Sequence, residues 1–197
     1  GGLQAPRGWF AKADIGTGEE FLAVPWRLVI TQDKALAAPT GELLRPAFER
    51  SAVWGLALFL LRERARGSAS AWAPYLAALP RSPLNAMSFP RAALHQLNGT
   101  YAMQHISDWR RDAAAAYDFC QEHLFSRFPE AFPAEIYSRG ALSWAVGTAR
   151  SRVMAIESTS LRPGGAPARK PTTYGLVPLA DLLPHVPAPP SGGKGGQ

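Results

Sequence analysis

Cysteine is almost absent from this sequence, since Cys120 is the only one among 197 residues. A single thiol excludes a disulfide within the chain and a zinc site built from several cysteines. Charged residues are also scarce, at 18%, against an ordinary share of about a quarter. The longest apolar run, residues 53–61, is too short to span a bilayer and is followed by Arg62, Glu63 and Arg64. We therefore expect neither a disulfide framework nor a membrane-embedded segment.

Basic residues outnumber acidic ones, 21 to 15, and give a net charge of +6. Part of this excess lies in residues 161–197, which hold four basic residues and one acid, Asp181. There is no dense run of lysine and arginine with interleaved aromatic residues, so the sequence does not favour nucleic-acid binding. Association of nucleic acid with the basic C-terminal residues is a weaker hypothesis. Hydrophobic residues make up 47% of the chain, enough for the core of one domain.

Short strands are predicted at the two ends of the sequence. Residues 8–13, 21–24 and 28–30 are short apolar runs, and the glycines of the 14–19 segment favour a turn between the first two. Near the other end, residues 174–179 have the pattern of a further strand. Strands at both ends and few elsewhere indicate that the sheet is small.

Helices are predicted through the middle of the sequence. Apolar residues from Val53 to Leu61 recur at helical spacing, Pro46 suits a helix start, and Gly67 suits a stop. Similar patterns predict helices around residues 72–79, 89–97, 102–125 and 133–146. The fold class is therefore α+β, with helices inserted between terminal strands. Residues 158–173 are predicted to form a surface loop, and the Pro/Gly-rich residues after 185 a disordered tail.

Four groups of residues follow one another in an order that carries a family resemblance. They are Gly8-Trp9-Phe10-Ala11-Lys12-Ala13-Asp14-Ile15 with Gly18-Glu19 and Val24-Pro25; Leu56-Ala57-Leu58-Phe59-Leu60-Leu61-Arg62-Glu63 with Trp72-Ala73-Pro74-Tyr75-Leu76 and Leu79-Pro80; Leu97-Asn98-Gly99-Thr100; and Trp144-Ala145, Ser151-Arg152 and Val177-Pro178-Leu179-Ala180-Asp181-Leu182-Leu183-Pro184-His185. Each group alone is weakly specific, but together they span almost all of residues 8–185. The sequence resembles the plant-type SET-domain protein methyltransferases, which include Rubisco large-subunit lysine methyltransferases and actin-histidine methyltransferases.

The resemblance implies an organisation and an activity. Residues 1–185 would form part of a SET domain, with N-terminal strands (1–31), a helical insert (46–150) and a cofactor-side strand and turn (174–185), followed by a low-complexity tail (186–197). The cofactor would be S-adenosylmethionine and the substrate a protein, methylated on lysine or, less favoured, on histidine. We expect a soluble intracellular monomer in plastid, cytoplasm or nucleus, without a metal, membrane or nucleic acid as partner.

The resemblance also assigns cofactor-binding residues, which belong to two separate stretches. The family's first turn contacts the cofactor, and a glycine there would allow close approach of the backbone. An aromatic pair could pack against the methylsulfonium cation. The residues matched in this way are Gly8, Trp9, Phe10, Ala11, Arg152, Asp181 and His185.

Simpler interpretations of these residues stay open. Trp9 and Phe10 suit a structural role, in an edge strand or in the core, as well as they suit cofactor binding. Asp181 could be an ordinary turn acid. A basic residue such as Arg152 near a helix end complements the helix dipole. His95, His105 and His123 lack metal-ligand spacing, and Cys120 reads as a packed thiol on a helix face.

Three departures from the family pattern bear on whether this chain is active, and two of them, Pro184 and the missing tyrosine segment, favour an alternative function. Pro184 stands where the family has a cofactor-binding asparagine, and proline offers neither an amide side chain nor a backbone N–H. The segment Ala5-Pro6-Arg7-Gly8 replaces a family Glu-Gly-x-Gly. The resemblance places the catalytic tyrosine beyond this chain, so no catalytic residue is predicted within it. The alternative is a non-catalytic, truncated SET module or gene-model fragment that acts as a protein-binding piece.

Overall fold

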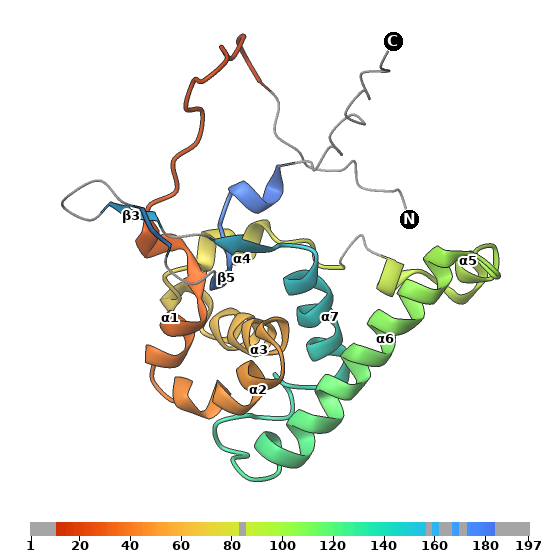
Figure 1. The fold of residues 1–197 in the computed structure, drawn as a ribbon. Coiled ribbons are helices and arrows are strands. Elements are labelled where there is room, and N and C mark those ends of the chain that lie inside the picture. The colour runs from red at the N-terminus through yellow and green to blue at the C-terminus, as the bar shows by residue number, and fades with distance from the viewer. Residues whose placement is uncertain (1–10, 83–85, 157–158, 162–166, 170–172, 184–197) are drawn as a thin grey trace.

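The computed structural model describes residues 11–82, 86–156, 159–161, 167–169 and 173–183 (Figure 1). Its helices and strands follow the order expected of helices inserted between strands. The helices are α1 (Gln32–Ala37), α2 (Arg45–Arg50), α3 (Ala52–Ala65), α4 (Ala73–Ala78), α5 (Arg91–His95), α6 (Tyr101–Cys120) and α7 (Arg139–Arg150), and the strands are β1 (Ile30–Thr31), β2 (Val153–Ile156), β3 (Thr159–Leu161), β4 (Pro167–Arg169) and β5 (Thr173–Leu176). The predicted α+β class is thus observed in its coarse form, as helices with a small antiparallel sheet.

The core is built around α3, which packs against α2 and α7. Residues 54–61 of α3 are all buried, so this helix has no solvent-facing stripe over that length. A helix that is apolar all round is stable only when other elements enclose it. Its fully buried leucines and Phe59 each contribute about 1.5–3 kcal/mol through loss of contact with water.

One helix predicted from Pro46 onward is two helices in the structure. Ser51 has extended backbone angles (φ −164°, ψ 131°) and separates α2 from α3. The break lets Phe48 fold against Gly55, where an added Cβ would lie 2.3 Å from the Phe48 ring. The glycine in the first turn of α3 is therefore required by packing and not by the helix itself.

The principal sheet has three antiparallel strands in the order β1-β5-β2. On β5, Leu176 faces both Ile30 of β1 and Val153 of β2, and Gly175 faces Thr31 and Met154. This register joins residues at opposite ends of the described chain. It places the end of β5 next to the turn that follows α7 (Figure 1).

Several predicted elements are wrong in detail. Residues 11–13 and 21–24 form no strand: their side chains are mostly exposed, so they bury no apolar face against the sheet of β1, β5 and β2. The strand expected at 28–30 is β1, shifted to Ile30–Thr31. The helix expected from Pro133 begins only at Arg139, where the Ser138 hydroxyl caps the Ala141 amide.

Other elements were not expected at all. No pattern in the sequence predicts α1 or β2, and the predicted surface loop at 158–173 contains the paired strands β3 and β4. The predicted tail and the rest of that loop lie outside the described residues. Among the helices that the structure describes, none has the length and apolar character needed to cross a membrane.

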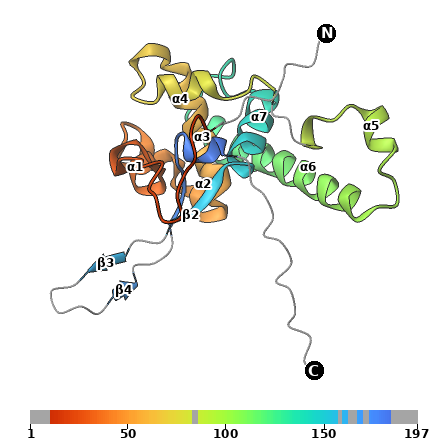
Figure 2. The same ribbon diagram turned by 90° about the horizontal axis from the view of Figure 1, so that it is seen from above.

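Helices α5 and α6 form an arm that extends away from the core (Figures 1 and 2). The C-terminal half of α6 contributes Ala113, Ala116 and Cys120 to the core, whereas Tyr101 at its other end is exposed. The helix ends in a π-helical turn, Gln121–Phe125, which buries Leu124 and Phe125. One end of α6 is thus anchored and the other stands in solvent.

Candidate functional site

Arg152 lies in the turn between α7 and β2. Helix α7 buries Leu142, Ala145 and Val146 against the core, which fixes where the helix ends. The Arg152 amide donates to the Ala149 carbonyl oxygen at 3.1 Å, and this bond closes the turn. The side chain of Arg152 is 14% exposed, so its charge lies largely within the protein.

Asp181 lies in the short 3-10 helix Ala180–Leu182, which follows β5. Leu179, just before it, has φ +75° and ψ −46°, a conformation that is strained for a residue with a branched side chain. The Asp181 amide donates to the Val177 carbonyl oxygen at 3.1 Å, across this sharp turn. The turn reverses the chain and directs Asp181 toward α4 and the end of α7.

Tyr75 of α4, Arg152 and Asp181 meet in one buried cluster. The Tyr75 hydroxyl donates a hydrogen bond to Asp181 Oδ2. The Arg152 guanidinium donates through Nη1 to the Asp181 main-chain oxygen at 3.0 Å, and the same nitrogen lies 3.6 Å from Oδ1. The cluster links α4 to the turn before β2 and to the 3-10 helix after β5. We call these three residues the Asp181 cluster.

Burial governs the ionisation of the cluster. The Asp181 side chain has no exposed surface, and desolvation raises its pKa above the usual 3.8, although the Tyr75 hydrogen bond and the Arg152 charge act in the opposite direction. Burial, followed by the neighbouring carboxylate, raises the pKa of Tyr75 well above its ordinary value of 10. Tyr75 therefore stays protonated and remains a hydrogen-bond donor at physiological pH.

Two buried polar atoms of the cluster have no hydrogen-bond partner among the described residues. They are Oδ1 of Asp181, an acceptor, and Nε of Arg152, a donor. An unsatisfied buried polar group costs about 1–3 kcal/mol, so such groups call for a partner. A ligand that offers both a donor and an acceptor would satisfy the pair. This arrangement can therefore hold a polar ligand.

The predicted cofactor-binding residues have separate outcomes. The structure brings Arg152 and Asp181 into contact, 29 residues apart in sequence. Ala11 is exposed at the beginning of the described chain. Gly8, Trp9, Phe10 and His185 lie outside the described residues, as does Pro184. No group of three or more potential metal ligands occurs in the part of the chain that the structure describes.

Comparison with known proteins identifies the relatives of this chain. The chain is 29% identical over 183 residues to the chloroplastic ribulose-1,5 bisphosphate carboxylase/oxygenase large subunit N-methyltransferase of Nicotiana tabacum, covering 90% of this chain and 33% of that protein. It is 28% identical over 185 residues to the chloroplastic [fructose-bisphosphate aldolase]-lysine N-methyltransferase of Arabidopsis thaliana, covering 92% and 34%. Homologues of this chain are SET-domain protein methyltransferases. No family model matches the sequence.

The fold supports the same relationship. A crystal structure of the SET domain of LSMT bound to MeLysine and AdoHcy superposes with a TM-score of 0.65 at 25% identity, covering 83% of this chain and 34% of that chain. The predicted resemblance to this family is therefore confirmed. The chain spans about a third of the length of the relatives it matches.

The resemblance pointed to Arg152 and Asp181 but gave Tyr75 no role at the site. Tyr75 lies 106 residues before Asp181, and its helical spacing with Trp72, Leu76 and Leu79 is that of a core residue. The one available signal was its polar hydroxyl, which needs a partner when the ring is buried. The sequence does not say which residue supplies that partner.

Proposed function

We propose that this chain is part of an S-adenosylmethionine-dependent protein methyltransferase, with lysine as the favoured methyl acceptor. The observation that best supports this proposal is the Asp181 cluster, which holds a buried donor and a buried acceptor without partners. The fold around it resembles that of a SET domain whose structure contains MeLysine and AdoHcy. S-adenosylmethionine, when bound, supplies a methyl group activated by its sulfonium charge. The chain's own contribution is to bind and orient, which can supply much of the acceleration in a transfer reaction.

The unpaired atoms of the cluster fit the polar groups of this cofactor. Nε of Arg152 can donate to a carboxylate, and Oδ1 of Asp181 can accept from an ammonium or a hydroxyl. S-adenosylmethionine carries all three groups on its amino-acid and ribose parts. Tyr75 acts on Asp181 and not on the ligand, because its hydroxyl is already committed to Oδ2.

The remaining sequence assignments extend this proposal. Gly8, Trp9, Phe10, Ala11 and His185 would complete the cofactor site. Residues 1–185 would form a partial SET domain with strands at both ends, and residues 186–197 a low-complexity tail. The partner would be a protein that a monomer of this chain recognises, with no nucleic acid or membrane involved.

A second candidate is a non-catalytic SET module that binds a protein without methylating it. Pro184 favours this candidate because it lacks the amide that the family uses at that position. The complete enclosure of the Asp181 side chain also favours it, since the cluster then serves to join α4 to the end of β5. The two candidates differ in whether the chain binds the cofactor.

Titration calorimetry with S-adenosylmethionine tests the proposal. We expect measurable heat for the chain and weaker binding for Arg152→Lys, which keeps the positive charge but lacks Nε. Arg139→Lys is the matched control, because Arg139 is 58% exposed and pairs with Asp118 away from the cluster. Absence of heat at millimolar cofactor would overturn the proposal and leave the non-catalytic module. Binding without methyl transfer to a lysine-containing protein would also favour that module.

A further inference from the structure

A long stretch of this sequence carries positive charge and no negative charge. Between Glu63 and Asp108 there is no acidic residue, whereas Arg64, Arg66, Arg81 and Arg91 all fall within that interval. A stretch of this length without an acidic residue is unusual, because carboxylates are normally interspersed among basic groups on a protein surface. The helices α4 and α5 and the start of α6 belong to this stretch.

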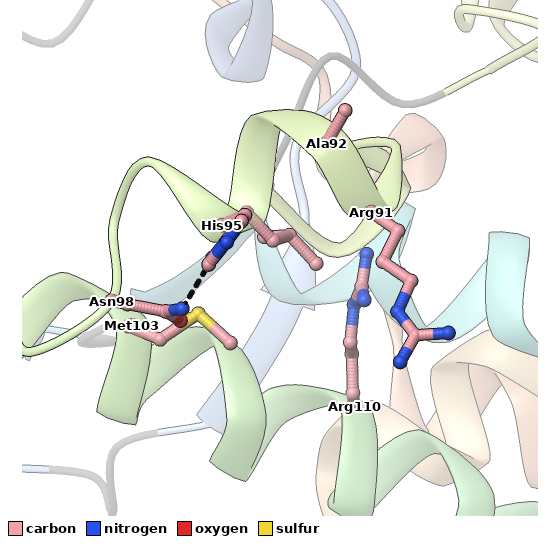
Figure 3. A pocket seen from close by; sticks show the side chains of 7 residues that line it. Arg91, Ala92, His95, Asn98, Met103 and Arg110 are labelled. Atoms are coloured by element: carbon pink, nitrogen blue, oxygen red, sulfur yellow. Dashed lines mark hydrogen bonds between the residues drawn. The ribbon is translucent and has the colours of Figure 1, made fainter.

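The acid-free stretch contributes to a hollow between α5 and α6 (Figure 3). The hollow measures about 850 Å³, and no Asp or Glu is among the residues that line it. Leu94 and Met103 give it an apolar part, and His95 and Asn98, which are hydrogen-bonded to each other at 2.6 Å, give it a polar edge. The guanidinium groups of Arg91 and Arg110 both reach into it.

Arg110 is held in place by neutral partners. Its Nη2 donates to the carbonyl oxygens of Met87 at 2.9 Å and Phe89 at 2.7 Å, and its Nε donates to Met87 at 3.2 Å. These carbonyls orient the guanidinium without neutralising its charge. Arg91, from the first position of α5, adds a second positive charge that no described carboxylate pairs with. The hollow is therefore cationic and one of its charges is preorganised.

We propose that this hollow binds an acidic segment of a protein partner. Carboxylates would pair with Arg91 and Arg110, and the methylene groups of glutamate would pack on Leu94 and Met103. A peptide is favoured over a nucleic acid because no Phe, Tyr or Trp ring lines the hollow to stack a base. The inference rests on the proposed function only in taking the partner to be the protein that the chain would methylate.

Fluorescence anisotropy with a labelled hexaglutamate peptide at low salt tests this site. We expect Arg91→Gln to weaken binding about threefold to tenfold, within the range for one partly exposed charge-assisted contact. Arg91→Lys should retain most of the affinity because it keeps the charge. Arg111→Gln is the matched control, since Arg111 is also on the arm but is 76% exposed and paired with Asp108.

Three results would overturn the inference. The first is no binding of hexaglutamate at low salt. The second is an equal loss of hexaglutamate affinity in Arg91→Gln and Arg111→Gln, which would mean that the net charge alone attracts the peptide. The third is tighter binding of a hexathymidylate than of the peptide, with the same dependence on Arg91. Calorimetry with S-adenosylmethionine distinguishes this inference from the proposed function. If the unsubstituted chain binds the peptide but not the cofactor, the proposed function is rejected and the role of the hollow stands.

Discussion

Asp181 is a carboxylate that the fold encloses completely, and this raises the question of what its charge contributes. Desolvation raises its pKa, with Tyr75 and Arg152 only partly compensating. When a carboxyl has a higher pKa in the folded chain than in the unfolded chain, its ionisation lowers the free energy of unfolding of the protein. The Tyr75 hydroxyl nevertheless needs a side-chain oxygen at this position as its acceptor, whereas Arg152 donates to the main-chain oxygen of Asp181.

The substitutions Asp181→Asn and Asp181→Ala separate these two effects. Asn keeps an oxygen for Tyr75 and removes the buried charge, so we expect it to be close to neutral or stabilising at pH 7. Ala leaves the Tyr75 hydroxyl without its acceptor and removes the carboxylate beside Arg152, whose bond to the main-chain oxygen remains. We expect this substitution to cost about 2–3 kcal/mol. Urea unfolding at pH 7 measures both free energies of unfolding.

The pH dependence of the Asp181→Asn effect has a defined sign. Because the folded pKa of Asp181 lies above the usual 3.8, the wild-type chain loses stability as pH rises from 3.8 through the folded pKa. Asn does not titrate, so the stability of the variant relative to wild type should rise with pH over that window and then level off. If the free energies of unfolding of the two proteins changed with pH in parallel, burial would not raise the pKa of Asp181, and the prediction would be wrong.

The site could be predicted from the sequence only as far as the family resemblance reaches. Arg152 and Asp181 belong to short groups of residues that the resemblance matches, and the structure places them together. Tyr75 could not be assigned because its contact spans 106 residues, and sequence patterns report only local spacing. The positive φ of Leu179 was equally hidden, since leucine is among the residues that do not favour this conformation.

Strand β5 depends on a glycine at its centre. A Cβ at Gly175 would lie 2.7 Å from the Ile30 carbonyl oxygen and 3.0 Å from Ile156 Cδ1. Because the nearest of these atoms is backbone of the paired strand β1, it cannot move without disturbing the ladder. We expect Gly175→Ala to lower the free energy of unfolding by about 1–3 kcal/mol, in the range for overpacking, as measured by chemical denaturation.

Gly140 provides the matched control for Gly175. It lies in the first turn of α7, and nothing stands within 4 Å of a Cβ added there. Alanine reduces the freedom of the unfolded chain and is the better helix former, so Gly140→Ala should stabilise by about 0.4–1 kcal/mol. Equal effects of the two substitutions would contradict the close approach of β1 and β5.

Asp112 joins three helices through one carboxylate. It accepts from Trp54 Nε1 of α3 at 3.2 and 3.3 Å and from Arg150 of α7. We expect Asp112→Ala to cost about 2–3 kcal/mol, because it leaves two partly buried donors unpaired. Asp118→Ala, on the same helix, removes only a 65% exposed pair with Arg139 and should cost less than about 1 kcal/mol. Thermal unfolding measures both effects, and similar decreases in the melting temperatures of the two variants would contradict this interpretation.

Long elements with an apolar period could be predicted, whereas the short strands β1 and β2 were displaced or missed. Apolar spacing located α3 and α6 because each runs for several turns. Strands β1 and β2 have two and four residues, too few to show a period of two. The break at Ser51 was also missed, since it follows from the packing of Phe48 on Gly55 and not from a helix-breaking residue.

The molecule as a whole combines an enclosed helix with an extended arm (Figure 1). Helix α3 is surrounded by α2, α7 and the other core elements. On the arm, Ile106 and Leu94 are buried but lie outside the main core cluster. Local opening costs least where few buried apolar contacts must be broken. The arm, which also carries the proposed peptide site, should therefore open independently of the core.

Amide hydrogen exchange followed by mass spectrometry tests this division, and α6 provides an internal comparison. Its two ends share one helix and one set of backbone hydrogen bonds, but only the C-terminal half packs in the core, through Ala113, Ala116 and Cys120. We expect slow exchange in α3 and in residues 113–120, and exchange at least about tenfold faster in residues 101–107, which corresponds to about 1.4 kcal/mol less protection. Uniform exchange along α6 would mean that the arm and the core unfold as one unit. Exchange that slows in the arm alone on addition of hexaglutamate would connect its local opening to the occupation of the hollow.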